Sequence, residues 1–201
     1  MKIRLFTLVV FMVCVNFVFA QNSAEIKTIK LEIEGKKNGE AYFIEIADRN
    51  VGASSNKINS FGEYYAWNNS NAPRERITMG TNRDEVGYAV EKFKAENGGD
   101  WRLPTRKELN AIMNNIDRKD GNIVIYNQKG DATKFIYLPY SGTIDENGEL
   151  SGAGRIGMYW TSDGMKKSKF AIALEVTKTA INNPQILKST VMSVRCVRNV
   201  K

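Results

Sequence analysis

The stretch GGDWRLPTRKEL, residues 98–109, separates two predicted helices and decides the middle of the fold. Gly98 stops the apolar repeat that precedes it, as glycine commonly does at the end of a helix. Thr105 and Glu108 form the T-x-x-E pattern of a capping box, in which each side chain bonds the backbone N–H of the other residue. A second helix is therefore expected to begin at Thr105.

The residues just before this cap are bulky. Pro104 pushes Leu103 into an extended conformation. We therefore expect Trp101 and Leu103 to pack beside the helix that they introduce, and Arg102 to face outward. Arg102 and Arg106 could instead bind sulfate, although arginines near a helix start more often pair with a carboxylate such as Asp100 or Glu108.

Working outward, apolar residues repeat at helical spacing on both sides of this stretch. The first helix is expected to be capped by Thr81 or Asn82, with Asp84 and Glu85 in its first turn. Its apolar face would consist of Val86, Ala89, Val90 and Phe93, and that of the second helix of Leu109, Ile112, Met113 and Ile116.

Strands are predicted at both ends of the chain from alternation and β-branched or aromatic content. Residues 26–34 and 40–48 form a predicted hairpin or pair of edge strands, and residues 49–76 an ordered loop. The later strands are expected within 135–142, 157–163, 169–176 and 191–199. Strands, two helices and strands again predict an α+β fold rather than alternating βαβ units.

The first twenty residues have the composition of a secretory signal. Lys2 and Arg4 precede an apolar run that is short for a membrane span, and Val18-Phe19-Ala20 fits a cleavage site before Gln21. We expect residues 1–20 to be removed, residues 21–201 to form a single domain, and no stable membrane span to remain. The expected location is periplasmic, secreted or at the surface of a Gram-negative cell.

Composition excludes several classes of function. Without Lys2 and Arg4, the chain has 27 basic and 22 acidic residues, so the net charge of the mature chain is only about +5. This scattered excess and the predicted export argue against a nucleic-acid partner. With 42% hydrophobic residues, the chain has enough apolar material for an ordinary core.

Cysteine and histidine usage narrows the chemistry further. The mature chain would hold one cysteine, Cys196, and the protein has no histidine. An internal disulfide, a Ser-His-Asp triad, a Cys-His pair and a histidine-bound zinc are therefore excluded. Paired carboxylates or a Ser-Lys dyad remain chemically open, but no spacing nominates either.

Seven motifs follow one another in an order that resembles a known family. They are ADRNVGA (47–53), FGEYYAW (61–67), GGDWRLPTRKEL (98–109), FIYLPYSG (135–142), DENGEL (145–150), GMYWTSD (157–163) and SVRCVRN (193–199). Their order and spacing, over about residues 42–199, resemble the Fibrobacter succinogenes major paralogous domain and the related Legionella collagen-like adhesin C-terminal domain (formerly DUF1566).

This resemblance implies a C-type-lectin-like module, similar to sulfatase-modifying factors, with a small twisted, mostly antiparallel sheet and two flanking helices. Related modules occur on exported and surface proteins, many from gut Bacteroidetes, and some are adhesins for sulfated polysaccharides. The formylglycine-generating activity of similar folds is not carried over, because it needs a cysteine pair and Cys196 is alone.

Several aromatic residues have two interpretations. Trp101 and Trp160 could stack on sugars, but burial in the core is the stronger expectation. Tyr64, Tyr65 and Trp67 lie in the predicted loop, and packing is again favoured over exposure.

Asp145, Asn147 and Glu149 alternate like calcium ligands, but they lack the rest of a calcium loop and are better explained as a hairpin turn. Cys196 alternates with Met192 and Val194 and is expected to be buried and unreactive. The sequence thus assigns no catalytic residue, metal ligand or cofactor, and it identifies no single ligand-binding residue.

The favoured function is an exported, non-catalytic module that recognises carbohydrate or another surface component through loops. The segments 54–76 and 143–156 are the expected contact surfaces. One alternative is a hydrolase with two carboxylates roughly 5 to 10 Å apart in a cleft. The other is a subunit of a surface assembly, marked by an exposed apolar patch or strand edge.

Overall fold

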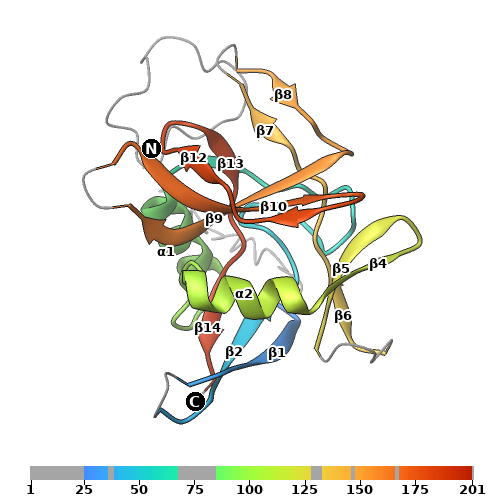
Figure 1. Ribbon diagram of the computed structural model, residues 1–201, viewed down its shortest axis with the longest axis vertical. Coiled ribbons are helices and arrows are strands. Elements are labelled where there is room, and N and C mark those ends of the chain that lie inside the picture. The colour runs from blue at the N-terminus through green and yellow to red at the C-terminus, as the bar shows by residue number, and fades with distance from the viewer. Residues whose placement is uncertain are drawn as a thin grey trace, which may run out of the picture.

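The computed structural model describes residues 25–35, 39–67, 85–127, 133–145, 148–165 and 168–200. Within them lie two helices and three mostly antiparallel sheets, so the predicted α+β class is confirmed. The expectation of one small sheet is wrong. In Figure 1, α2 (Arg106–Asn114) crosses the front of the molecule, with β9 and β10 above it and β1, β2 and β14 below.

The first sheet joins the two ends of the described chain. Its antiparallel order is β1-β2-β14, formed by β1 (Thr28–Ile33), β2 (Tyr42–Ala47) and β14 (Val197–Asn199). Ile29, Leu31 and Ile33 alternate with more exposed neighbours, as the sequence predicted. The hairpin expected over residues 26–34 and 40–48 is therefore confirmed.

The central sheet contains eight strands. They are β3 (Tyr64–Ala66), β7 (Thr143–Ile144), β8 (Leu150–Ser151), β9 (Ile156–Gly164), β10 (Phe170–Thr177), β11 (Ile181–Asn182), β12 (Gln185–Leu187) and β13 (Val191–Ser193). The path runs β11-β10-β9-β13-β7-β8, while β12 pairs with β10 and β3 with β13. The pairing between named strands is antiparallel except for Ser193 against Tyr159, where β13 runs parallel to β9.

A third sheet was missed by the sequence interpretation. It has the antiparallel order β4-β5-β6, formed by β4 (Ile116–Lys119), β5 (Asn122–Tyr126) and β6 (Phe135–Tyr137). The signal was present as Asp120-Gly121, which have φ angles of 52° and 76°. Two consecutive positive φ angles are what a two-residue hairpin turn requires. Ile116, expected on the second helix, begins β4 instead.

The strand predicted over residues 191–199 is interrupted between β13 and β14. The carbonyls of Val194 and Cys196 accept bonds from the N–H groups of Val51 and Ala47 at 3.0 and 3.1 Å. These bonds to a distant segment replace the ladder of a continuous strand. Cys196 is fully buried, as expected, and burial raises its thiol pKa to about 12, which keeps it protonated. The expected alternation is wrong, because all residues from 191 to 197 are buried.

Similarly, only residues 135–137 of the predicted strand 135–142 are extended in a sheet. The predicted loop over residues 49–76 contains β3, in which Tyr64 and Tyr65 are buried. Both rings therefore pack, as the sequence analysis favoured. Trp67 is partly buried, and its indole N–H donates to the carbonyl of Thr161 at 2.8 Å.

Helix α1 (Val86–Asn97) starts later than predicted. Its N-cap is Glu85, whose backbone is extended and forms a bridge with Ala66 of β3. The bridge holds Glu85 outside the helix, so the expectation that Glu85 lies in the first turn is wrong. Thr81, Asn82 and Asp84 lie outside the described residues, as does the predicted signal peptide. Gly98 ends the helix as predicted.

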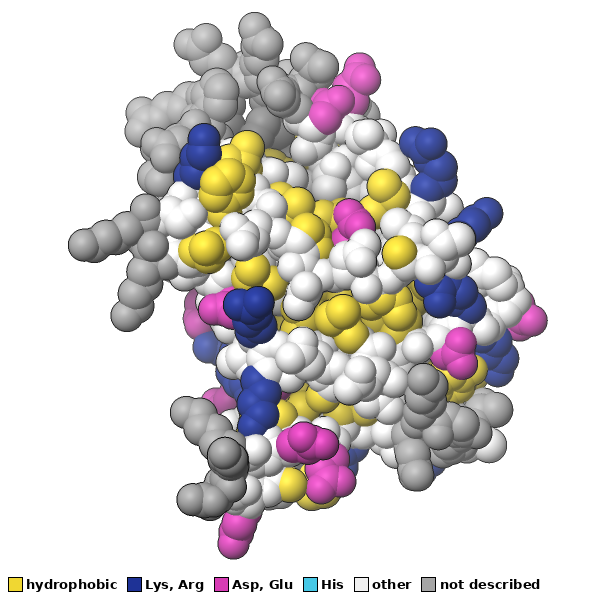
Figure 2. Space-filling model, viewed as in Figure 1, with side chains coloured by type: hydrophobic (Ala, Val, Ile, Leu, Met, Phe, Trp, Pro, Cys, Tyr) yellow, Lys and Arg dark blue, Asp and Glu magenta, His cyan; other side chains and the backbone are white. Residues whose placement is uncertain are grey.

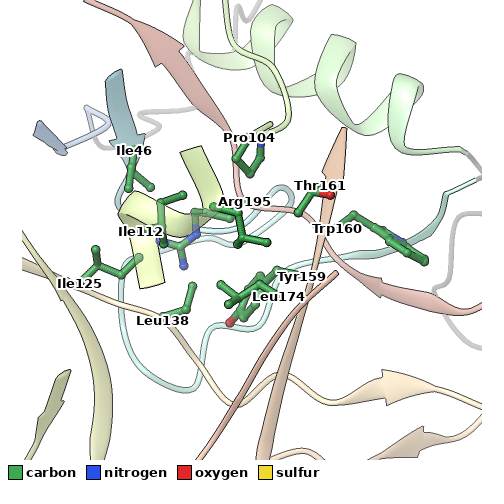
Figure 3. A pocket seen from close by; sticks show the side chains of 11 residues that line it. Ile46, Pro104, Ile112, Ile125, Leu138, Tyr159, Trp160, Thr161, Leu174 and Arg195 are labelled. Carbon is green, nitrogen blue, oxygen red and sulfur yellow. The ribbon is translucent and has the colours of Figure 1, made fainter. Parts of the chain in front are cut away.

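The strands β9 and β10 separate two hydrophobic clusters. Tyr159 faces the cluster of α2, while Trp160 faces the cluster of α1. Figure 3 shows the two rings pointing away from each other. Each helix thus covers one face of this strand pair, because side chains alternate between the two faces of a strand.

The bulky residues of the stretch 98–109 pack against a different helix from the one expected. Trp101 and Leu103 are buried as predicted, but they belong to the cluster of α1 and not to that of α2. The Trp101 ring meets Phe93 of α1 edge-on at 5.3 Å between centroids. The tryptophan therefore packs against the helix that precedes it in the chain.

The predicted capping box is confirmed, and it is part of a larger network. Glu108 is 1% exposed and accepts bonds from the Thr105 N–H at 2.8 Å and from both Arg102 terminal nitrogens at 2.7 and 2.8 Å. Tyr42 of β2 also donates to this carboxylate at 3.1 Å. The pairing of Arg102 with a carboxylate such as Glu108, which the sequence favoured over sulfate binding, is confirmed, and this pairing keeps Arg102 from facing freely outward.

Glu108 should make stability depend on pH. Burial alone would raise its pKa, but the bonds from Arg102 and Thr105 outweigh burial and lower it. A lowered folded-state pKa stabilises the fold at pH values above the ordinary glutamate value of about 4.3, and this contribution is lost as the pH falls through the folded-state pKa. We expect Glu108→Gln to cost about 2 kcal/mol at pH 7.

Urea denaturation at pH 7 and at decreasing pH tests this prediction. The difference between the wild type and the variant should shrink below pH 4.3. Glu91→Gln is the control, because Glu91 is 70% exposed and pairs with Lys94 on the surface of α1. A constant difference across the pH range would contradict the assignment to Glu108.

Candidate functional site

A polar hollow lies between α1 and the loop that follows β2. This polar groove has a volume of about 550 Å³. Its lining residues come from three parts of the chain: Arg49, Asn50, Gly52, Ala53, Ser54, Glu63, Lys92, Phe93, Glu96 and Asn97. A volume of this size is typical of small-molecule sites.

The loop side of the polar groove is fixed by buried hydrogen bonds. Val51 is fully buried and bonds the backbone of residues 63 and 194. The Asn50 side chain donates to the Phe61 carbonyl at 2.8 Å and accepts from Arg195 at 2.8 Å. The backbone of this wall is therefore held in place without a ligand.

Arg195 is the anchor of this wall, and the sequence analysis did not single it out. It is 5% exposed and also donates to the carbonyls of Ala47 and Tyr137 at 2.9 and 3.1 Å. Burial lowers its pKa, while Tyr159 and Asp48 oppose that effect. One guanidinium thus joins the ends of β2 and β6 to the groove loop.

The helix side of the polar groove carries a charged pair. Lys92 donates to Glu63 at 2.5 Å, and the Tyr65 hydroxyl donates to the other oxygen of Glu63. Burial alone would lower the pKa of Lys92, but its bond to Glu63 and the negative charges of Glu63 and Glu96 raise it. Lys92 therefore stays a cation between two carboxylates.

Several polar atoms in the groove remain available to a ligand. Lys92 has three N–H donors, and only one of them is bonded within the described part of the chain. The carboxylate of Glu96 and the side-chain oxygen of Asn97 accept no bond from a described residue. Arg49 pairs with Asp48 through Nε at 2.9 Å, which leaves its Nη1 without a described partner. The groove therefore offers both donors and acceptors.

The predicted contact segments meet at β13. Val191 pairs with Ala66 of β3 and with Ile144 of β7, so the segments 54–67 and 143–156 flank one strand. Ser54 and Glu63 of the first segment line the polar groove. Thr143, Ser151 and Ile156 of the second segment line a separate groove of about 290 Å³. Residues 68–76 lie outside the described residues.

The turn at residues 145–149 behaves as a hairpin, as predicted. Asp145 and Glu149 are joined by two bonds, from the Asp145 N–H to the Glu149 carbonyl and from the Glu149 N–H to Asp145 Oδ1. Strands β7 and β8 pair on either side of it. Within the described ranges, no group of three or more acidic, cysteine or histidine residues could hold a metal ion. Asn147 lies outside them.

The cavity in the described part of the core is too small for a ligand such as a sugar. A cavity beneath α2 measures only about 20 Å³ and is lined mainly by aliphatic side chains (Figure 3). This volume holds about one water molecule. Trp101 and Trp160 are 1% and 0% exposed, so the prediction that both are core residues is confirmed.

Comparison of the chain with protein-family models, curated proteins and solved structures found no match. None of the helices that the structure describes is long and apolar enough to cross a membrane.

Proposed function

We propose that the protein is an exported, non-catalytic module that binds carbohydrate in the polar groove. The observation that carries this proposal is the mixture of free donors and acceptors on a preformed wall. Each sugar hydroxyl both donates and accepts hydrogen bonds, so it suits a site that offers Lys92 and Arg49 beside Glu96 and Asn97. Two basic and two acidic side chains line the groove, which favours a neutral ligand over a strongly charged one.

The resemblance to the adhesin-related family agrees with this proposal. A C-type-lectin-like module with a signal peptide would present such a groove outside the inner membrane. The α+β class with helices on opposite faces of a strand pair is compatible with that family picture. The fold identity and the export remain part of the proposal.

A glycan array probed with residues 21–201 tests the proposal, followed by calorimetry on the best ligand. We expect Lys92→Ala to weaken binding about tenfold or more, because it removes a charged donor from the groove. Lys178→Ala is the control, since Lys178 is an exposed lysine that lines neither the polar groove nor any of the other grooves described here. A folded sample that binds no glycan would refute carbohydrate binding.

Glycoside hydrolysis is the second candidate, because Glu63 and Glu96 line one groove. Binding remains favoured since both oxygens of Glu63 are already engaged by Lys92 and Tyr65, which leaves it poorly placed to act as an acid, base or nucleophile. Incubation with the bound glycan and assay of new reducing ends separates the two functions. Release that is abolished by Glu96→Gln would establish hydrolysis.

A role in a surface assembly is favoured by one feature of the exterior. Figure 2 shows a band of hydrophobic side chains across the middle of one face, between α2 and β10. Such a band suits a protein partner. A molar mass that rises with concentration in light scattering, without glycan binding, would favour assembly over carbohydrate recognition.

A further inference from the structure

Helix α1 separates the polar groove from a second one. The second groove measures about 330 Å³ and lies between α1 and the segment around Trp101. It is lined by Val86, Gly87, Val90, Glu91, Lys94, Trp101, Arg102, Leu103, Thr105 and Ser162. The α1 residues in this set differ from those in the polar groove, because the two sets lie on different faces of the helix.

The second groove has an apolar floor and a polar rim. Val86, Val90, Trp101 and Leu103 are all buried and form a hydrophobic base. Charged and hydroxyl side chains, including the ion pair of Glu91 and Lys94, surround it. A pyranose ring presents an apolar face of C–H groups edged by hydroxyls, so it matches this arrangement.

The solvent-facing side of α1, between the two grooves, carries an exposed aromatic ring. Tyr88 is 52% exposed, and it lies one turn before Lys92 on the same side of the helix. On a helix with 3.6 residues per turn, Tyr88 falls between Glu91 of the second groove and Lys92 of the polar groove. A ligand that crosses the helix would pass over this ring.

We propose that the second groove is a second subsite for the same glycan, which crosses α1 over Tyr88. This inference rests on carbohydrate binding in the polar groove. A helix with its side chains is about 10–12 Å across, so the ligand must be a chain of several sugars and not a single unit. Two linked contacts strengthen binding because the second is intramolecular once the first has formed.

Gly87 provides a specific test of the second subsite. A Cβ atom added there meets nothing within 4 Å, and the glycine lies inside α1, where other residues are better helix formers. Gly87→Trp should therefore fill the groove without straining the fold. Gly87→Ala is the matched control, since it makes the same backbone change with almost no added volume.

The affinity of residues 21–201 is measured by calorimetry for cello-, xylo- and manno-oligosaccharides of one to six units. We expect binding of the preferred series to strengthen tenfold or more from two units to six. Gly87→Trp should return the six-unit affinity to that of two units, while Gly87→Ala leaves it unchanged. Lys92→Ala should weaken every length that binds.

Three results would overturn the second subsite. The first is an affinity that does not increase beyond one or two sugar units. The second is a Gly87→Trp variant that binds six units as tightly as the wild type. The third is a Gly87→Trp variant that no longer binds the apolar dye ANS but still binds the oligosaccharides, which would indicate an apolar partner instead. If no sugar of any length binds, the proposal for the polar groove fails as well.

Discussion

Trp160→Ala is expected to lower the free energy of unfolding by about 4–5 kcal/mol. Trp160 is fully buried in β9 and packs in the cluster that includes α1. Truncation would leave a large cavity in a tightly packed region. It would also remove the bond from the indole N–H to the Tyr65 carbonyl at 2.7 Å. That carbonyl would then be buried without this donor.

Far-UV circular dichroism during urea denaturation measures this effect. A loss of 4 kcal/mol should also lower the melting temperature by roughly 10 °C for a chain of this size. A shift below about 1 kcal/mol would show that Trp160 is not packed as described.

The two buried tryptophans provide a matched comparison. Trp160 has a hydrogen-bond partner, whereas the indole nitrogen of Trp101 is buried without one among the described residues. Replacement of either by phenylalanine removes similar area. We therefore expect Trp160→Phe to cost about 1 kcal/mol more than Trp101→Phe, because only Trp160 loses a bond.

Arg195→Leu is expected to lower the free energy of unfolding by about 3–5 kcal/mol. The variant removes three hydrogen bonds and leaves the carbonyls of Ala47 and Tyr137 and the oxygen of Asn50 without their donor. Leucine fills part of the volume, but it cannot satisfy these buried acceptors. Because Asn50 lines the polar groove, glycan affinity should fall together with stability.

Urea denaturation and calorimetry on the same samples test both effects. Arg195→Lys should recover only part of the stability, because an ammonium cannot reproduce the planar, multidentate geometry of the guanidinium. Arg118→Leu is the control, since Arg118 is exposed and its side chain donates a single bond within the described residues, to the Thr177 carbonyl. Equal losses in Arg195→Leu and Arg118→Leu would contradict the anchoring role.

Local sequence patterns predicted the elements whose signals lie within a few residues of one another. The capping box at Thr105 and Glu108, the stop at Gly98 and the hairpin of β1 and β2 all have the form expected. The hairpin of β4 and β5 carried an equally local signal in Asp120-Gly121 that the sequence interpretation overlooked.

Other features depended on contacts between distant segments. Glu85 lies outside α1 because it bridges Ala66. The strand after Val191 breaks because the carbonyls of Val194 and Cys196 accept bonds from Val51, in the loop after β2, and from Ala47 at the end of β2. A propensity for helix or strand is worth a few tenths of a kcal/mol per residue, so such long-range hydrogen bonds override it.

The polar groove depends even more on contacts between distant segments, which the sequence could not predict. Its residues come from positions 49–54, 63 and 92–97, which have no shared spacing in the sequence. Arg195 supports it from a strand connection nearly 150 residues away from Asn50. Of the predicted contact segment 54–76, the described residues Ser54 and Glu63 line this groove, while residues 49–53 and α1 supply the rest.

By itself, then, the sequence determined the α+β class, the burial of Trp101 and Trp160 and the ends of the helices where caps are local. The absence of histidine and the single cysteine of the predicted mature chain also limited the chemistry. Only the tertiary structure decided which helix Trp101 packs against, which carboxylate holds Arg102 and which side chains share a groove. The physical reason is range: caps and turns depend on bonds between near neighbours, whereas packing and grooves depend on how segments far apart in the chain are brought together.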